Sequence, residues 1–405
     1  MTEAMKIIYV TMQWPCASET FCSRDVLALR EMGHAVNVLA LKPSPANAGY
    51  LLKSQKSDSV PFCATSFWGY IEGILSALIH PSDFLRFIVE VLREEKSFSH
   101  KKSLLLLIPT FFWAAKKIIY QNPDIIHLFW GHYPCGVAEI IKYRLGKRKI
   151  VLTQFLGAYD LNMSLSLSKK VSKYADAVFT HAEANVQSLL DMSIPENKLH
   201  VVHRGIDIQS MDGALFGQFR QQRDPYRLIF VGRLVKEKGV AYILQATKII
   251  KQIYPSINLE IIGDGPEMGR LQSLAKGLNL SDCVSFRGYL PPLEVYHSLY
   301  NSSFFVFPST SGGERLPNSV KEAMYAGVVP IVSRTNGISE LVKDGHDGFI
   351  FGEISSEAIS RLVLQVMREG EWEEISKNAR KTIAENFDVN VSMEQYVKIW
   401  SVNAS

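Results

Sequence analysis

Two glutamates flank a loop-to-helix turn in the second half of the 405-residue chain. Glu314 lies in the small, polar loop 309–315, and Glu322 lies one turn into a helix predicted over 318–326. Pro317 suits the start of that helix because its missing N–H is no loss there. The N–H groups of a helix start can bind an anion, and carboxylates accept hydrogen bonds from hydroxyl groups. This turn could hold a phosphorylated, polyhydroxylated ligand, although two such glutamates alone are more often solvated surface acids.

Two cations follow a different predicted strand, 226–231, in the same half of the chain. Arg233 offers a bidentate fork to a phosphate group, and Lys238 offers a compact charge. Such fixed cations can stabilise the negative charge that develops on a leaving diphosphate. Neither an Asp-x-Asp pair nor a histidine cluster with metal-ligand spacing accompanies them. The sequence therefore predicts chemistry without a metal or other cofactor, although the two cations alone could also be solvated loop residues.

The elements that would position these residues alternate between strands and helices in two successive series. The first series begins with a strand over 6–12, a helix ended by Gly33 and a strand over 35–41. This alternation predicts an α/β fold of two Rossmann-like, doubly wound domains. We expect the first domain at 1–210, a linker at 211–225, the second domain at 226–386 and a terminal helix at 387–405.

Two sequence motifs resemble those of a known family. Residues 314–327 follow the order Glu–x–x–Pro–Asn–x–x–x–Glu–Ala–Met–x–x–Gly, and residues 231–239 read VGRLVKEKG. Both resemble the donor site of the family 4 retaining glycosyltransferases, also called glycosyl transferases group 1. The resemblance implies the GT-B architecture, in which two Rossmann-like domains face a cleft and the last helix crosses back to the first domain.

The resemblance also implies roles for residues of the second domain. Arg233 and Lys238 would clamp the diphosphate, Glu314 would accept hydrogen bonds from the donor sugar, and Glu322 would bind the ribose. Gly288 and Tyr289 match the loop that contacts the base in relatives. The remaining expected donor-binding residues are Gly232, Arg315, Leu316, Pro317 and Asn318.

The first domain departs from the family pattern. Relatives often carry a histidine in the turn that here reads Leu–Gly–Ala–Tyr–Asp at 156–160. His132 lies just past a predicted strand and is the candidate that replaces it, whereas His127 lies inside an apolar run and is interpreted as a core residue. Gly157 and Asp160 are expected on the acceptor side. So are Ser18 and Glu19, whose surroundings resemble a subgroup associated with bacterial surface-polysaccharide assembly.

Charge and apolar patterning bear on location and partners. The net charge of +4 is mild and no nucleic-acid motif is present, so we expect no nucleic-acid partner. Five scattered cysteines and the lack of a signal peptide predict a cytoplasmic protein. Residues 61–120 contain apolar residues at helical spacing, with lysine pairs at 101–102 and 116–117. These helices could be ordinary core helices, or, with the basic stretch 142–149, they could contact an anionic membrane at the inner face of the plasma membrane.

These features together predict a retaining, metal-independent glycosyltransferase. It would move a sugar from a UDP- or GDP-sugar to a glycan or polyprenyl-linked glycan acceptor in surface or exopolysaccharide biosynthesis. Retaining enzymes of this fold are thought to use a front-face reaction, so no protein nucleophile is required. Two alternatives remain open: a nucleotide-sugar epimerase of the same architecture, and a non-catalytic subunit that binds a nucleotide sugar or glycan.

Overall fold

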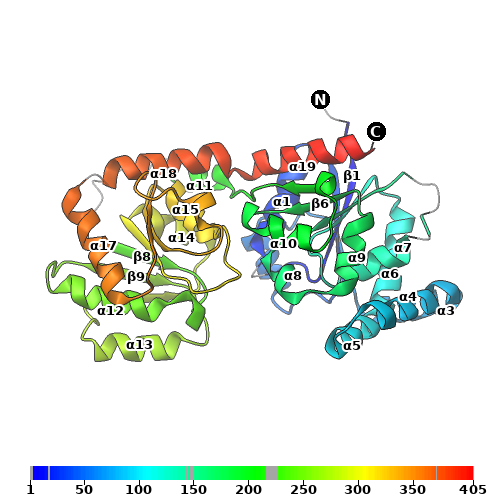
Figure 1. The fold of residues 1–405 in the computed structure, drawn as a ribbon, viewed down its shortest axis with the longest axis horizontal. Helices are drawn as coiled ribbons and strands as arrows, with labels where there is room; N and C mark the ends of the chain where they lie inside the picture. Colours follow the sequence, from blue (N-terminus) through cyan, green and yellow to red (C-terminus); the bar gives the residue numbers. More distant parts are fainter. Residues whose placement is uncertain are drawn as a thin grey trace. The chain divides into compact units, whose positions relative to one another are not determined.

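The protein forms two compact α/β units, each built on one parallel sheet (Figure 1). The structure, a computed structural model, describes residues 3–16, 19–142, 144–145, 149–215, 226–370 and 372–404, without the side chains of 214 and 215. Unit 1 comprises Met1–His203 and Val389–Ser405, and unit 2 comprises Arg204–Asp388. The predicted α/β class with two doubly wound domains is confirmed.

The sheet of unit 1 has seven parallel strands in the order β3-β2-β1-β4-β5-β6-β7. The strand order reverses between β1 and β4, because the chain moves outward through β2 and β3 and then returns to the other side of β1. Ligands in open parallel sheets bind at the carboxyl ends of the strands at such a reversal. The strands are β1 (Lys6–Thr11), β2 (Ala35–Ala40), β3 (Phe62–Ala64), β4 (Ile125–Leu128), β5 (Val151–Phe155), β6 (Ala177–Thr180) and β7 (Leu199–Val201).

Helices cover both faces of this sheet, which agrees with strands that are buried on both faces. Those that follow the strands are α1 (Thr20–Glu31), α2 (Ala48–Ser54), α7 (Cys135–Ile141), α8 (Ala158–Met163), α9 (Ser166–Tyr174) and α10 (Val186–Asp191). Short 3-10 turns lie at Glu183–Asn185 and Glu196–Lys198.

Four consecutive helices separate β3 from β4, where a simple β–α–β unit would have one. They are α3 (Phe67–Ile79), α4 (Pro81–Glu94), α5 (Phe98–Leu106) and α6 (Ile108–Gln121). The apolar side chains of α6 are buried in one core cluster with the strands β1 and β4. None of the described helices is by itself long and apolar enough to cross a membrane, although α5 and α6 together, bent by 51°, meet the same criterion of length and composition.

The last helix, α19 (Val389–Ala404), packs on the sheet of unit 1. The ring of Tyr396 stacks on Phe179 with 4.0 Å between centroids. Trp400 donates its indole N–H to the hydroxyl of Thr153 at 3.2 Å, and the same hydroxyl lies 2.9 Å from Nδ1 of His127. The expected return of the chain's end to the first domain is confirmed, and His127 is a hydrogen-bonded core residue, as predicted.

The sheet of unit 2 has six parallel strands in the order β10-β9-β8-β11-β12-β13. The strands are β8 (Arg227–Val231), β9 (Asn258–Ile262), β10 (Val284–Gly288), β11 (Phe304–Phe307), β12 (Val329–Ser333) and β13 (Phe349–Phe351). Its helices are α11 (Ile208–Leu215), α12 (Val240–Lys251), α13 (Met268–Gly277), α14 (Pro292–Tyr300), α15 (Asn318–Tyr325), α16 (Ile338–Leu341), α17 (Ser356–Glu369) and α18 (Trp372–Asn386). The strand order again reverses, here between β8 and β11.

The structure places helix α11 where the sequence predicted the start of a linker. The carboxylate of Asp207 accepts a hydrogen bond from the backbone N–H of Ser210 at 2.8 Å, which stabilises the helix start. Asp212 in α11 accepts a hydrogen bond from the hydroxyl of Tyr325 at 2.8 Å and pairs with Arg380. These contacts attach residues 204–215 to unit 2, so this unit begins before the predicted boundary at 226. The rest of the predicted linker, 216–225, lies outside the described residues.

Candidate active site

The loop between β11 and α15 carries the first candidate residues. Strand β11 is buried along its whole length, and its aromatic and β-branched residues suit a strand covered on both faces. Pro317 is the N-cap residue of α15, and the helix begins at Asn318, where the sequence predicted it. No side chain of the described residues caps this helix start. Its first backbone N–H groups therefore depend on water or a ligand for hydrogen bonds.

A second loop lies against this one, because β8 and β11 are neighbours in the sheet. Thr310 donates its backbone N–H to the carbonyl oxygen of Glu237 at 2.7 Å. Gly239 has a φ of +67°, and a Cβ atom there would lie 2.3 Å from the carbonyl oxygen of Pro308. Only glycine permits both the left-handed conformation and this close approach. The glycine thus allows the residue before it, Lys238, to reach the β11 loop.

Lys238 and Glu314 form an ion pair across these two loops. The ammonium of Lys238 also lies 4.7 Å from the ring centroid of Phe307, at the end of β11. The carboxylate of Glu314 accepts a second hydrogen bond, from the hydroxyl of Ser309 at 3.2 Å. Ser309 is fully buried, and its carbonyl oxygen accepts a hydrogen bond from Ser333 at 2.7 Å. Two predicted site residues that are far apart in sequence are therefore in contact.

Ser309 was missed by the sequence reasoning, which treated it only as part of a polar loop. The available signal was its position immediately after a buried strand, next to Pro308. In the structure it fixes the Glu314 carboxylate, and Ser333 in turn fixes the Ser309 backbone. These two serines hold the carboxylate in place through neutral hydrogen bonds.

Other predicted donor residues lie around the same edge of the sheet. Arg233 is exposed and forms no ion pair with any residue that the structure describes. Burial lowers the pKa of the Arg315 guanidinium, whereas the Glu340 carboxylate nearby opposes that shift. Glu322 is half-buried on α15, and Asn318 accepts a hydrogen bond from Lys321 at 3.3 Å. Leu316 and Pro317 are buried between them and pack rather than present polar atoms.

Glycines let the loops after β8, β9 and β10 pack closely together. A Cβ atom on Gly263 would lie 1.9 Å from the carbonyl oxygen of Gly232. The backbone N–H of Gly263 donates to the carbonyl oxygen of Gly288 at 2.8 Å. Gly288 itself has a φ of +66°, and the side chain of Tyr289 beyond it is more than half exposed. Gly232 and Gly288 are thus linked through the turn that follows β9.

The second group of candidates lies in unit 1, at the ends of the neighbouring strands β4 and β5. One carboxylate oxygen of Asp160 accepts hydrogen bonds from the backbone N–H of His132 at 3.0 Å and from its Nδ1 at 2.9 Å. The other oxygen accepts the backbone N–H of Gly157 at 2.9 Å and so caps helix α8. The structure therefore brings together three residues that the sequence had named separately. Because Nδ1 faces the carboxylate, Nε2 is the ring nitrogen that remains for a ligand.

Aromatic side chains surround His132. Its ring centroid lies 6.0 Å from that of Trp130 and 5.6 Å from that of Tyr159. Tyr159 is 60% exposed, so one face of this cluster is open to a ligand. The start of α1 contacts the same cluster, since Phe21 lies 6.0 Å from Trp130. Glu19, the N-cap residue of α1, is half-buried near this point, whereas Ser18 lies outside the described residues.

Metal-ligating side chains are not clustered in the part of the chain that the structure describes. There, no group of three or more histidine, cysteine, aspartate or glutamate residues is arranged to hold an ion. The polar groups at the two sites are instead cations, carboxylates and one imidazole. Such groups can bind phosphates and hydroxyls through charge and hydrogen bonds.

Two family models match the chain and together span most of it. Residues 19–210 match "Glycosyltransferase Family 4", and residues 214–382 match "Glycosyl transferases group 1". Two curated relatives are similar over nearly their full lengths. The amylovoran biosynthesis glycosyltransferase AmsK of Erwinia amylovora is 24% identical over 98% of this chain and 99% of its own. The putative colanic acid biosynthesis glycosyltransferase WcaL of Salmonella typhimurium is 24% identical over 95% and 96%.

Solved structures share the fold at low sequence identity. Anabaena HepE in complex with UDP and glucose aligns with a TM-score of 0.71 and 17% identity, over 98% of this chain and 99% of that one. Sucrose-phosphate synthase from Thermosynechococcus elongatus aligns with a TM-score of 0.70 and 14% identity, over 98% of both chains. These likenesses extend over both sheets and the last helix.

Proposed function

Because the chain belongs to family 4 of the glycosyltransferases and has their GT-B fold, we propose that it transfers a sugar from a UDP- or GDP-sugar with retention of configuration and without a metal ion. The acceptor is a glycan or polyprenyl-linked glycan of a surface or exopolysaccharide. The names of the two relatives, which refer to amylovoran and colanic acid biosynthesis, support this class of product. The likeness to a structure that contains UDP supports a nucleotide-sugar donor.

The observation that carries this proposal is the contact between Lys238 and Glu314 at the carboxyl edge of the second sheet. Transfer breaks the bond between the anomeric carbon and the diphosphate, and the leaving diphosphate gains negative charge. Lys238 and the exposed Arg233 supply fixed positive charge to stabilise it. The carboxylate of Glu314, held by Ser309, accepts hydrogen bonds from hydroxyls of the donor sugar. Glu322 binds the ribose hydroxyls.

The acceptor half of the reaction is assigned to unit 1. Asp160 orients His132 so that Nε2 can accept a hydrogen bond from a sugar hydroxyl. In a front-face reaction the departing phosphate takes the proton of the acceptor hydroxyl, so His132 acts on orientation and polarity and forms no covalent bond. Tyr159 offers an exposed aromatic face on which an acceptor sugar can stack. The enzyme works on the cytoplasmic side, at the inner face of the plasma membrane.

A panel of nucleotide sugars tests the donor assignment, because a ligand that binds the folded protein raises its melting temperature. We expect a UDP- or GDP-sugar to raise it, and Lys238→Ala and Glu322→Ala to remove most of the effect. If both variants keep full donor binding and transfer, the site assignment is wrong.

Addition of EDTA should leave turnover unchanged. A loss of activity that Mn²⁺ restores would contradict metal independence, and an inverted anomer in the product would contradict retention.

The same assays separate the two alternatives. A nucleotide-sugar epimerase would convert the donor in the absence of any acceptor, which NMR of the donor alone would detect. A non-catalytic binding subunit would show the thermal shift but no transfer with any acceptor. The contact of a cation with a carboxylate beside the start of α15 favours an enzyme over a binding subunit, since stabilisation of a leaving group is needed only for a reaction.

A further inference from the structure

The outer surface of helices α3, α4 and α5 exposes large apolar side chains. Trp68, Leu75 and Leu78 on α3 and Leu85, Val89 and Leu92 on α4 are each more than half exposed. We call these six residues the apolar face. Helix α6 packs on the sheet, and α3 packs on α6, so the apolar face lies at the periphery of unit 1 (Figure 1). An exposed apolar surface of this kind marks an interaction site.

Helix α3 turns its small residues inward and its large ones outward. A Cβ atom on Gly73 would lie 1.8 Å from the carbonyl oxygen of Pro109 in α6, and one on Gly69 would lie 3.1 Å from the indole nitrogen of Trp113. The two glycines are one helical turn apart and let the helix backbones approach closely. A helix of a water-soluble domain normally buries its large apolar residues. Close packing through small residues, with large apolar residues outward, is typical of helices that face lipid.

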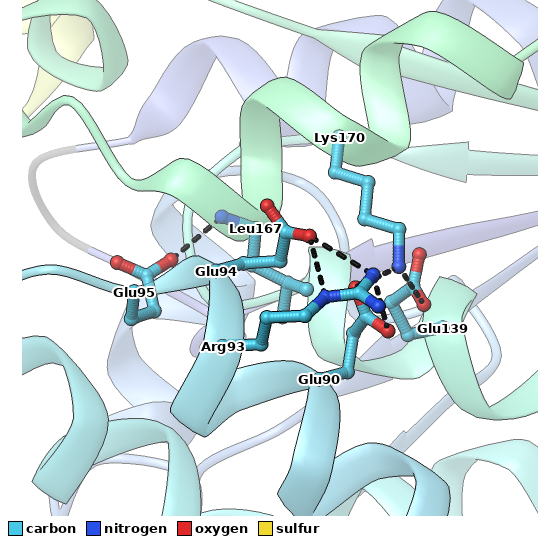
Figure 2. A network of polar contacts seen from close by, with 7 residues as sticks. All are labelled: Glu90, Arg93, Glu94, Glu95, Glu139, Leu167 and Lys170. Atoms are coloured by element: carbon cyan, nitrogen blue, oxygen red, sulfur yellow. Dashed lines mark hydrogen bonds and ion pairs between the residues drawn. The ribbon is translucent and has the colours of Figure 1, made fainter.

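Helix α4 also exposes apolar side chains, although it buries Phe87 and Val91 in the core of unit 1. Leu85, Val89 and Leu92 recur at helical spacing on its outer side, whereas Glu90 points toward the domain. Figure 2 shows Glu90 beside Arg93 and Lys170, and Lys170 also contacts Glu139 of α7. Glu90 is thus paired with Lys170 inside unit 1, whereas Leu85, Val89 and Leu92 remain exposed.

The acids of this region have hydrogen-bond or ion-pair partners inside unit 1. Each carboxylate between residues 67 and 121 has a partner within unit 1. Glu72 pairs with Lys116 and Lys117, Asp83 with Arg144, Glu90 with Lys170, Glu94 with Arg93, and Glu95 with the backbone N–H of Leu167 and with His100.

Two lysines of the same region differ from Lys116 and Lys117, which pair with Glu72. Lys96 and Lys102, at the junction of α4 and α5, are exposed and form no ion pair with any described residue. Phe98 lies between them and is 81% exposed. The surface therefore presents apolar and aromatic side chains next to positive charge, while its carboxylates are paired or hydrogen-bonded within unit 1.

We propose that the apolar face docks onto an anionic phospholipid bilayer, with Lys96 and Lys102 at the headgroups and the apolar side chains below them. Burial of apolar area and attraction to anionic headgroups are the two contributions that hold a peripheral helix on a membrane. A second copy of this chain fits the surface less well, because it would bring the same lysines together without free acids. The inference deepens the proposed function, on which it rests for a lipid-linked acceptor.

Contacts within unit 1 fix the position of the apolar face relative to His132 and Asp160. Glu95, at the end of α4, accepts the backbone N–H of Leu167 at the start of α9, and Lys170 of α9 holds Glu90 (Figure 2). Helix α9 follows α8, whose first turn carries Asp160. Docking of α4 on a bilayer would therefore hold His132 and Asp160 at a defined height above the headgroups.

Sedimentation of the full chain with vesicles tests the proposal. We expect the protein to bind vesicles of phosphatidylglycerol and phosphatidylethanolamine, and to bind phosphatidylcholine vesicles roughly tenfold more weakly. Lys96→Gln with Lys102→Gln should reduce binding to the anionic vesicles by a similar factor and remove its dependence on salt. Trp68→Ser with Leu78→Ser and Leu92→Ser should abolish binding to both. Ile253→Ser, at an exposed apolar position of unit 2, is the matched control and should bind normally.

The melting-temperature shift with a nucleotide sugar is measured on the same samples. An unchanged shift in the triple variant shows that folding and donor binding are intact, so that lost vesicle binding reports on the surface. Vesicle binding by a protein without transferase activity would overturn the proposed function and leave this inference standing. Equal sedimentation of wild type and triple variant would overturn the inference. So would a wild type that fails to bind vesicles and forms dimers that the triple variant lacks.

Discussion

One carboxylate oxygen of Asp160 accepts both the backbone N–H and the Nδ1 of His132, at 3.0 and 2.9 Å. The two residues come from the loops after adjacent strands, β4 and β5, and Asp160 is buried. The double contact fixes the position of the residue as well as the tautomer of the ring. In the proposed reaction Asp160 is therefore a positioning residue, and Nε2 of His132 is the atom assigned to contact the acceptor.

We therefore predict that His132→Gln lowers kcat roughly a hundredfold, the effect expected when a polar group that acts on the reacting hydroxyl is lost. Asp160→Asn should lower kcat less, because the histidine remains but its Nδ1–H loses a charged acceptor. The measurement is kcat and KM with a short acceptor analogue.

His127→Gln is the control for these variants, since His127 lies in the core against Thr153 and the rings of α19. It should lower the melting temperature and leave kcat per folded molecule unchanged. Full kcat in His132→Gln would contradict the assigned role of His132.

A second prediction concerns the ion pair of Lys238 and Glu314. Lys238→Met and Glu314→Gln should each lower kcat/KM by about 10²–10³, the effect of removing one charge-stabilising group. Because the two groups are in contact, the double variant should lose less than the product of the single losses. Lys236→Met, an exposed lysine two positions away, should be neutral. If the loss of kcat/KM in the double variant equals the product of the two single losses, the pair does not act as a unit.

Part of the candidate donor site was predictable in its geometry, because Lys238 and Glu314 lie in short motifs at strand ends. In a parallel sheet the carboxyl ends of neighbouring strands share one edge, so Lys238 and Glu314 were expected near each other. The supporting contact from Ser309 was not predicted, because its position just after a buried strand does not show which side chain its hydroxyl meets. On the acceptor side, His132 and Asp160 were named separately, and only the pairing of β4 with β5 places them in contact.

The helices between β3 and β4 show a different limit. Apolar spacing predicted helices there but left open whether they were core helices or a membrane surface. The structure contains both a core helix and helices with an exposed apolar side. Helix α6 is a core helix, and α3 exposes its large residues because Gly69 and Gly73 face α6. Periodicity shows that a helix has an apolar side, but it does not show which side packs when small residues occupy the other.

A third prediction concerns Tyr159, whose exposed ring lies beside His132 and Trp130. Tyr159→Ala should raise KM for the acceptor about tenfold with little change in kcat, since a stacking surface stabilises bound sugar before and during the reaction alike. Tyr159→Phe keeps the ring and should behave as wild type. An equal loss in the Phe variant would indicate that the hydroxyl, rather than the aromatic face, binds the acceptor.

A fourth prediction follows from the pair of Glu90 and Lys170. Burial disfavours the charge of Glu90, but the hydrogen bond and charge of Lys170 outweigh it and hold the pKa of this carboxyl below its usual value. Burial likewise disfavours the charge of Lys170, and its contacts with Glu90 and Glu139 outweigh this and raise its pKa. The lowered pKa contributes stability that is present above the unfolded value of 4.5 and is lost as pH falls through the folded value. The raised pKa contributes stability that is present below 10.5 and is lost as pH rises through the folded value.

Lys170→Met should therefore lower the melting temperature of unit 1 by several degrees between pH 6 and 9. The loss exceeds that of a surface pair, because Glu139 is nearly buried and would be left without its cation. The difference from wild type should shrink as pH falls below 4.5 through the lowered folded pKa of Glu90, where this carboxyl becomes neutral and no longer needs Lys170. Lys169→Met, the neighbouring residue on α9, is the control and should show no such dependence. A difference that stays constant from pH 7 to pH 4 would mean that Lys170 stabilises α9 through packing of its aliphatic chain and not through charge.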